Sequence, residues 1–151
     1  MSRTLVICKP DAVERGLSGE IIRRLEQKGL RLLACELRTI DRETAAVHYE
    51  EHRGKAFFDD LVEFIGRSPA MVMVIEGPPD TWRMVRSMMG PTDPAAAAPG
   101  TIRGDLGTVL AENLIHGSDG PDSAEREIAL FFPSLAGDVR RPISPLEGKD
   151  R

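Results

Sequence analysis

The longest apolar run in the chain has only six residues, at positions 70–75 (AMVMVI). A run of this length is far too short to span a bilayer as a helix, which needs about 20 apolar residues. It is typical of a strand buried on both faces, as is a second run at positions 5–8 (LVIC). Two such runs predict a covered sheet at the centre of the fold.

The segments around these runs supply the rest of the sheet and its helices. Residues 31–40 carry apolar side chains at period two, and an apolar pair at 114–115 predicts a last strand leading to His116. Apolar residues at helical spacing predict helices at 18–29, 41–51, 57–66, 80–89 and 122–131. The predicted N-caps are Ser18, Asp41 and Asp80, and Asp122 with Glu125 resembles a capping box.

The order of these elements predicts an α+β fold. Its connectivity is of the ferredoxin-like split βαβ type, with a four-stranded antiparallel sheet and helices packed over one face. The apolar side chains expected on the helix at 41–51 are Ala45, Val47 and Tyr49. At 151 residues and 41% hydrophobic composition, residues 1–151 can bury their own core and are expected to form a single domain.

Charge and cysteine usage narrow the class of protein further. The net charge is −4, and the basic residues are spread without a stripe, so nucleic acid and anionic membranes are poorly supported as partners. Cys8 and Cys35 lie in apolar segments and form no CxxC pair, which predicts buried thiols in a reducing compartment. Since the N-terminus has no signal-peptide layout, the expected location is the cytoplasm.

Two segments lack apolar periodicity. Residues 91–105 form a long irregular stretch, with four alanines that suffice for one helical turn. Long loops in compact domains are more often functional than accidental. After Phe132 the sequence has prolines and basic residues without periodicity, and we expect an extended or partly disordered tail from about residue 133.

His116 is the side chain best suited to chemistry in this chain. It emerges at the end of the last predicted strand, and Gly117, Ser118 and Asp119 follow it directly. An imidazole is a nucleophile or a base when one ring nitrogen is free and the other is held. A lone histidine beside a serine is more often a hydrogen-bonded loop residue, so this stretch alone does not decide between the two interpretations.

Cationic side chains lie where the chain leaves other predicted elements. Lys9 follows the first strand, Arg86 lies on the helix at 80–89, and Arg103 lies in the long loop, where Thr92 adds a hydroxyl. Lysine and arginine are the side chains best suited to phosphate. A single arginine is usually a solvated surface group, whereas a lysine rarely ends an apolar strand without a partner. Neither GxxxxGKS/T nor GxGxxG occurs, so side chains must bind any phosphate.

Three segments resemble those of the nucleoside diphosphate kinase family. They are residues 4–12 (TLVICKPDA), 99–105 (PGTIRGD) and 113–119 (NLIHGSD), in the family's order and spacing. The similarity extends from about residue 4 to residue 132. It implies a ferredoxin-like fold and an enzyme, a phosphotransferase that moves the γ-phosphoryl group of a nucleoside triphosphate, mainly ATP, to a nucleoside diphosphate.

The resemblance also implies roles for individual residues. His116 matches the nucleophile that becomes a phosphohistidine between two half-reactions, and Ser118 and Glu127 match the residues that hold its ring. Glu127 lies on the last predicted helix, from which it can accept a hydrogen bond from one ring nitrogen. The aromatic on which the base stacks matches Phe57, which by itself is equally well explained by core packing, as is Tyr49. The residues that match contacts to phosphates and ribose are Lys9, Tyr49, Arg86, Thr92, Arg103 and Asn113.

Magnesium is the cofactor that the resemblance implies. The sequence shows no carboxylate cluster for a protein-bound metal, so Mg²⁺ is expected to arrive bridging the nucleotide phosphates. The resemblance further implies a homo-oligomer, and we favour a hexamer over a tetramer. Departures from the family pattern at Pro91, at 95–98 and after Phe132 concern subunit contacts rather than chemistry.

Two other classes of protein remain as alternatives. A binding or regulatory protein could keep this fold without turnover, but the intact Lys9, Arg103 and His116 argue against it. A nucleic-acid-binding module would need a steep dependence of affinity on salt, which this charge balance does not suggest. For the enzyme, stacking on Phe57 predicts little discrimination between bases.

Overall fold

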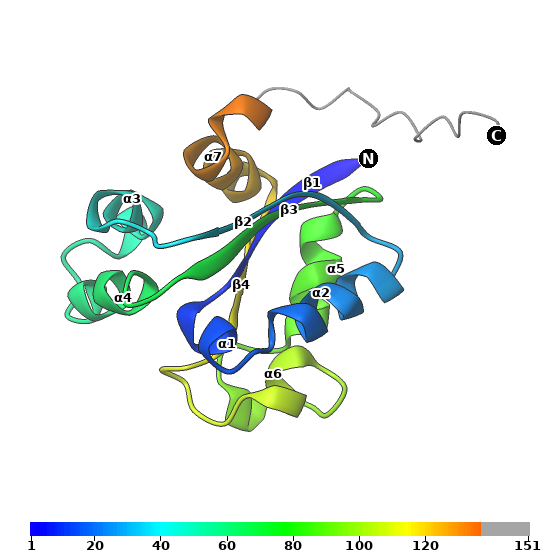
Figure 1. Cartoon of the computed structure of the whole chain (residues 1–151), viewed down its shortest axis with the longest axis horizontal. Helices are drawn as coiled ribbons and strands as arrows, with labels where there is room; N and C mark the ends of the chain where they lie inside the picture. Colours follow the sequence, from blue (N-terminus) through cyan, green and yellow to red (C-terminus); the bar gives the residue numbers. More distant parts are fainter. Residues whose placement is uncertain (137–151) are drawn as a thin grey trace.

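A four-stranded antiparallel sheet lies at the centre of the fold, which a computed structural model describes for residues 1–136 (Figure 1). The strands are β1 (Ser2–Cys8), β2 (Arg31–Arg38), β3 (Ala70–Gly77) and β4 (Ile115–Gly117), and their order in the sheet is β2-β3-β1-β4. The two apolar runs of the sequence lie in the central strands β1 and β3. The predicted antiparallel α+β fold is confirmed.

Helices cover both faces of this sheet (Figure 1). One face carries α1 (Pro10–Glu14), α2 (Ser18–Gln27), α5 (Thr81–Met89) and α6 (Ile102–Leu106), and the other carries α3 (Arg42–His48), α4 (Phe58–Ile65) and α7 (Pro121–Phe131). Along β1, Val6 and Cys8 pack with the first group, whereas Leu5 and Ile7 pack with the second. The prediction of helices over one face was wrong, because an uninterrupted apolar strand needs apolar neighbours on both sides.

Three short 3-10 turns complete the described chain: η1 (Glu50–His52), η2 (Pro94–Ala96) and η3 (Pro133–Leu135). η2 lies at the start of the alanine segment, where the sequence left room for one helical turn. The predicted irregular stretch 91–105 ends inside α6. The expected extended tail begins instead with the turn η3, and its remainder, residues 137–151, lies outside the described residues.

The predicted helix caps are confirmed only in part. Asp41 caps α3, because its carboxylate accepts a hydrogen bond from the Thr44 amide at 2.8 Å. Asp80 precedes α5 but has a φ of 62°, and its side chain makes no cap hydrogen bond. The hydroxyl of Ser2 instead accepts a hydrogen bond from the Thr81 amide at 3.0 Å. The start of β1 thus caps α5 from a distant part of the sequence.

Two other predicted caps were wrong. Ser18 is the first residue of α2 rather than the residue before it. Asp122 follows Pro121 inside α7, so it forms no capping box with Glu125. Proline suits the first helical position because it has no amide hydrogen to leave unpaired.

Two side chains that were predicted to be buried are exposed. Cys8 is buried in β1, but Cys35 is exposed because β2 lies at the edge of the sheet. On α3, Ala45 and His48 are buried, whereas Val47 is 47% exposed. A helix repeats every 3.6 residues, so position 48 shares the face of position 45 and position 47 does not. A histidine therefore faces the core where a valine was expected.

Candidate active site

His116 is the middle residue of β4, and a strained turn precedes it. In the sheet register His116 pairs with Ile7 of β1. Leu114, just before the strand, has a φ of 74°, a left-handed conformation that costs a residue with a side chain of the order of 1–3 kcal/mol. Two hydrogen bonds hold it there: the Leu114 amide donates to the buried carboxylate of Asp11 at 3.0 Å, and its carbonyl accepts from the Lys9 amide at 2.8 Å. The segment after β1 thus fixes how His116 enters the site.

Glu127 on α7 holds the ring of His116. Its Oε1 atom lies 2.7 Å from Nε2 of His116 and 2.9 Å from Oγ of Ser118, which donates to it. An ionised carboxylate only accepts hydrogen bonds, so Nε2 carries the proton and Nδ1 keeps its lone pair. Ser118 also accepts a hydrogen bond from the Leu5 amide at 3.2 Å. It therefore orients the carboxylate and affects the ring only through Glu127.

A second histidine, His48 on α3, packs against the first. The two ring centroids are 4.7 Å apart with the planes at 79°, and His48 also meets the rings of Tyr49 and Phe131 edge-on. Burial, followed by the proximity of His116, lowers the pKa of His48 to about 2, so this ring is neutral near pH 7. Its Nδ1 atom is buried and has no hydrogen-bond partner within residues 1–136.

Lys9 and Asn113 belong to a second hydrogen-bond network near His116, which contains the cations of the site. The Lys9 ammonium donates a hydrogen bond to Oδ1 of Asn113 at 2.7 Å, and the Asn113 amide donates to the Thr92 carbonyl at 3.0 Å. Burial and, second, the nearby Arg103 lower the pKa of Lys9 to about 8. Thr92 contributes its carbonyl to this network, which leaves its hydroxyl for other contacts.

Arg103 is almost completely buried and joins three segments of the site. Its guanidinium donates to the carbonyls of Gly90 at 3.0 Å, Asn113 at 3.1 Å and Ile115 at 2.6 Å. A guanidinium has five N–H groups, so two remain for a ligand. Burial and the charge of Arg86 lower the pKa of Arg103 to about 10, which leaves it a cation at neutral pH.

Arg86 reaches the same strand from α5. Its Nη1 atom donates to the carbonyl of Gly117 at 3.1 Å, directly after His116. A Cβ atom on Gly117 would lie 2.7 Å from Sδ of Met89, so a larger residue would force the Met89 side chain to move where α5 approaches β4. The close approach brings the Arg86 side chain to the end of the strand.

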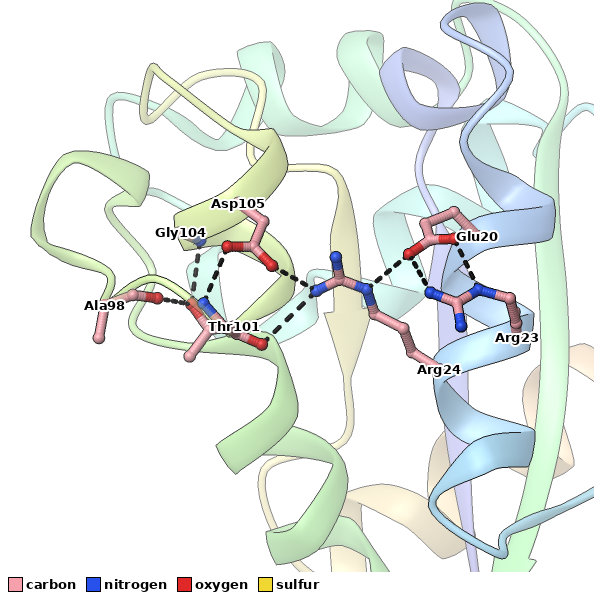
Figure 2. Close-up of polar contacts among 8 residues, drawn as sticks. Glu20, Arg23, Arg24, Ala98, Thr101, Gly104 and Asp105 are labelled. Carbon is pink, nitrogen blue, oxygen red and sulfur yellow. Dashed lines mark hydrogen bonds and ion pairs between the residues drawn. The ribbon is translucent and has the colours of Figure 1, made fainter.

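Arg103 lies in the helix α6 rather than in a loop as predicted, and an ion-pair network anchors this helix and the loop before it (Figure 2). Asp105 accepts hydrogen bonds from the Gly100 amide at 2.8 Å and pairs with Arg24 of α2 at 2.9 Å. Arg24 in turn donates to Glu20 at 2.9 Å. These exposed pairs contribute little individually, but together they connect the loop to a helix of the core.

The start of α6 fixes the same loop from within. The hydroxyl of Thr101 accepts a hydrogen bond from the Gly104 amide at 3.0 Å and donates to the Ala98 carbonyl at 2.6 Å. A Cβ atom on Gly104 would lie 2.0 Å from that carbonyl oxygen, which excludes any larger residue without a backbone shift. The motif PGTIRGD thus builds a rigid support for Arg103.

Tyr49 ends α3 and Phe57 precedes α4, and these two helices cover the face of the sheet opposite to α5 and α6. Tyr49 is buried beside His48, whereas Phe57 is 46% exposed. The Phe57 ring lies 5.4 Å from the ring of His52, and the ammonium of Lys55 is 5.7 Å from its centroid. Among the described residues, Phe57 makes no direct contact with a cation of the phosphate side.

The structure therefore joins most of the predicted site residues and leaves two apart. Direct hydrogen bonds, to one another or to the backbone beside His116, connect Lys9, Arg86, Thr92, Arg103, Asn113, His116, Ser118 and Glu127. Tyr49 packs against the ring of His48, and burial and the nearby charge of Glu127 raise its pKa, whereas Phe57 lies beside His52.

Two residues of the site were not predicted. Asp11 holds the strained turn at Leu114, and its place two positions after Lys9 at the end of an apolar strand was an available signal. His48 packs on His116, and strict helical spacing from Ala45 would have placed it on the buried face. Asp11 and His48 both support other residues of the site, so their residue types alone did not identify them as site residues.

Taken together, the sheet and its helices present a histidine with one nitrogen held and one free beside three buried or half-buried cations. Such a site is suited to accepting a phosphoryl group. The sequence matches the family model described as nucleoside diphosphate kinase over residues 2–136. Relatives named nucleoside diphosphate kinase include one from Thermobifida fusca, 57% identical over 136 residues (90% of this chain, 100% of the relative), and one from Thermomicrobium roseum, 57% identical over 132 residues (87% and 88%).

Solved structures agree with the sequence comparison. A halophilic nucleoside diphosphate kinase from Halobacterium salinarum, in complex with CDP, is 53% identical with a TM-score of 0.86 over 93% of each chain. The enzyme from Encephalitozoon cuniculi is 39% identical with a TM-score of 0.88 over 95% of each chain. The chain belongs to the nucleoside diphosphate kinase family, and it is an enzyme, a phosphotransferase that acts on nucleotides. In the described part, no helix has the length and apolar character needed to cross a membrane.

Proposed function

We propose that His116 carries the phosphoryl group between two nucleotides as a phosphohistidine, in a ping-pong mechanism. The 2.7 Å contact between Nε2 and Glu127 carries this proposal, because it leaves the lone pair on Nδ1. In the first half-reaction Nδ1 attacks the γ-phosphorus of a nucleoside triphosphate, mainly ATP. The N–P bond forms as the bond to the bridging oxygen breaks and the diphosphate leaves with that electron pair. In the second, a terminal oxygen of another diphosphate attacks the phosphohistidine and releases the ring.

The cations around His116 are proposed to neutralise the charge that shifts during transfer. A metaphosphate-like transition state needs positioning and charge neutralisation more than covalent help. Lys9 uses one of its three protons on Asn113, and Arg103 uses three of its five N–H groups, so both keep donors for phosphate oxygens. Arg86 completes the cationic side. The proposed contacts to phosphates and ribose also include Tyr49, Thr92 and Asn113.

Magnesium is proposed to enter with the nucleotide. Beside His116 the described residues offer imidazole nitrogens and the single carboxylate of Glu127, not a set of oxygen ligands, and one carboxylate oxygen of Asp11 accepts from the Leu114 amide. Mg²⁺ prefers several oxygen ligands and keeps its waters, so these residues do not fit a protein-bound ion. Bound to the nucleotide phosphates, Mg²⁺ would supply further charge neutralisation. Lys9, Arg86 and Arg103 then bind the remaining phosphate oxygens.

The test is to mix the purified protein with ATP and Mg²⁺ and measure protein-bound phosphate. We expect phosphate that is labile in acid and stable in base, as a phosphohistidine is, and its transfer to an added diphosphate. Tryptic mapping should place it on the peptide that contains His116. Phosphate that resists acid, or that stays on the protein when a diphosphate is added, would contradict the proposal.

A homo-oligomer, a hexamer rather than a tetramer, is also proposed. Within residues 1–136, β2 pairs only with β3, and its outer edge carries Leu37, which is 56% exposed. An open edge with an exposed apolar side chain favours association. Light scattering at micromolar concentration measures the mass, and a monomer would contradict this expectation.

A further inference from the structure

We propose that the pocket around the nucleophile is also an inhibitory binding site for a late first-row divalent cation, represented by Zn²⁺. Its ligands are His48, His116 and Glu127, which come from α3, β4 and α7. Each offers one ligand atom, and these three atoms lie within 4.8 Å of one another. Residues far apart in the sequence thus converge on one point between a strand and two helices.

The spacing of these atoms is close to that of a zinc site. Zn–N and Zn–O distances near 2.0–2.2 Å and tetrahedral angles place ligand atoms about 3.3–3.5 Å apart. Nε2 of His116 and Oε1 of Glu127 are now 2.7 Å apart, and the widest separation in the group is at most 4.8 Å. Side-chain shifts of about 1.5 Å or less would bring all three into range. Three protein ligands leave the fourth position for water.

His48 provides an independent reason to expect a ligand. It is 9% exposed, and its Nδ1 atom is buried without a hydrogen-bond partner in the described residues. Buried polar atoms are almost always paired, so an unpaired one needs an explanation. The phosphoryl transfer derived above does not use His48. A cation that accepts the imidazole lone pair would satisfy it.

The donor set selects the type of metal. Two imidazoles and one carboxylate suit Zn²⁺, Co²⁺, Ni²⁺ or Cu²⁺, whereas Mg²⁺ prefers oxygen ligands. Mg²⁺ carried by a nucleotide and Zn²⁺ held by this pocket are therefore distinct in both position and ligands. The His116 side chain is 21% exposed, which gives the ion access from solvent.

Binding of the ion would stop phosphoryl transfer. If the metal binds Nδ1 of His116, it uses the lone pair that attacks phosphorus. If it binds Nε2, it displaces the proton shared with Glu127, and the neutral ring then carries its proton on Nδ1. Either way the nucleophile is lost. The inhibition rests on the proposed phosphohistidine, whereas the binding of the metal does not.

The binding experiment uses Co²⁺, whose visible absorption reports four-coordinate ligation, with Zn²⁺ as the competitor. A Cys35→Ser background removes the exposed thiol, the other soft ligand on the surface. We expect one Co²⁺ per chain, displaced by Zn²⁺. His48→Gln should weaken binding at least about tenfold, whereas the matched change His52→Gln should leave it unaltered. Equal binding by His48→Gln, or equal loss in His52→Gln, would overturn the site.

A second measurement keeps all three ligand residues, so its result cannot be explained by a variant that fails to fold. The chain has three histidines, and ¹⁵N NMR resolves their ring nitrogens. On addition of Zn²⁺ the signals of His48 and His116 should move together, and that of His52 should not. Movement of His52 alone would overturn the site.

Activity measured in parallel separates this proposal from the phosphohistidine. We expect Zn²⁺ to lower the exchange rate in proportion to the occupancy of the site, and His48→Gln to raise the inhibitory concentration at least about tenfold. Binding without inhibition would overturn the inhibitory role and the assigned nucleophile, but not the ligand set. If the protein forms phosphohistidine normally but binds no Co²⁺ or Zn²⁺, only the metal site is overturned.

Discussion

The two sides of His116 are built differently. On the phosphate side, Lys9, Asn113 and Arg103 are buried or half-buried and are tied to one another and to the backbone by hydrogen bonds. On the proposed base side, Phe57 is 46% exposed, and its neighbour His52 lies 3.2 Å from the Lys55 ammonium and 3.6 Å from a carboxylate oxygen of Glu51. The groups proposed to bind phosphate are thus held in place before a nucleotide arrives, whereas the surface proposed for the base is solvated.

From this difference we expect the phosphate side to determine the rate of transfer and the base side to determine the affinity for the nucleotide. Preorganised charges stabilise a transition state because they need not reorient when charge shifts. An exposed aromatic ring contributes stacking, which depends little on the identity of the base. Substitutions on the phosphate side should therefore lower kcat, and those on the base side should raise KM.

The largest effect is expected from His116→Ala. Loss of the nucleophile should reduce nucleotide exchange to background, a loss of several orders of magnitude, because His48 is buried and the Ser118 hydroxyl is buried and bonded to Glu127. The fold should persist, since the side chain is partly exposed and β4 is an edge strand of the sheet. A coupled assay with two different nucleotides measures the loss, and circular dichroism checks the fold. A folded variant with normal exchange would contradict the nucleophile.

Arg103→Ala should lower both kcat and stability, whereas Lys9→Ala should lower mainly kcat. Removing the guanidinium takes its donors from the carbonyls of Gly90 and Ile115, each at a cost of about 1–3 kcal/mol, whereas the Asn113 carbonyl keeps the Ile115 amide at 2.9 Å. Lys9 gives up only its bond to Asn113. Steady-state kinetics and thermal unfolding of both variants separate the two effects. A rise of KM alone in either variant would make that residue a ground-state anchor rather than a stabiliser of the transition state.

Glu127→Ala should be milder than His116→Ala and more severe than Ser118→Ala. Glu127 contacts the ring directly and fixes its tautomer, while Ser118 acts through that carboxylate. We expect kcat losses of about 10²-fold and about 10-fold, by analogy with groups that orient a reactive imidazole. Single-turnover phosphorylation by ATP measures both. A larger loss in Ser118→Ala would reverse the order of support inferred here.

The pH dependence tests the environment of Lys9. Its pKa of about 8 means that the ammonium loses its proton as the pH rises through 8, so kcat/KM should fall on the alkaline side, about tenfold by pH 9. Unfolding does not explain such a fall, because the unfolded chain keeps that proton up to the ordinary lysine pKa of 10.5, and the contribution of Lys9 to stability therefore rises between pH 8 and 10.5. Lys9→Ala should lose this limb of the profile, whereas the exposed Lys55→Ala should retain it.

Local sequence patterns predicted the two central strands, the antiparallel α+β fold and most of the phosphate side. Residues 5–8 and 70–75 are apolar without interruption, a pattern that requires burial on both faces. The same pattern implies helices on both faces of the sheet, although helices were predicted over one face only. The resemblance to a family then located His116, Lys9 and Arg103, whose types also suit phosphate chemistry without it.

Features that depend on tertiary contacts were not predictable in this way. The cap of α5 comes from Ser2, which is distant in sequence from Thr81. The strained turn at Leu114 is held by Asp11, from another element. The cluster of His48, His116 and Glu127 is invisible in the sequence because its members share no motif and meet only when α3 and α7 pack on the sheet. Residue propensity and spacing describe a single helix or strand, whereas these features arise from contacts between different helices and strands.

The smallest effect expected is the difference in kcat/KM between acceptors with different bases. It tests the exposed surface around Phe57 most directly. Discrimination by several orders of magnitude requires buried polar groups that pair with a particular base and are left unpaired by the others. The ring of Phe57 offers no hydrogen bond, and His52 and Lys55, the polar groups beside it, are accessible enough for water to replace any bond they lose. Stacking contributes about 1–3 kcal/mol per base and tolerates all of them.

The kcat/KM values of ADP, GDP, CDP and UDP, measured with one donor, should therefore differ by about tenfold at most, about 1.4 kcal/mol, with the purines ahead through larger overlap. Phe57→Ala should raise KM for all four acceptors and leave kcat nearly unchanged, because the ring is proposed to contact the base and not the phosphate in transit. Lys55→Ala is the matched control, since it removes the cation beside the ring but keeps the stacking surface. A spread beyond about a thousandfold would require a hydrogen-bonding base pocket, and the solvated surface around Phe57 could not then be where the base binds.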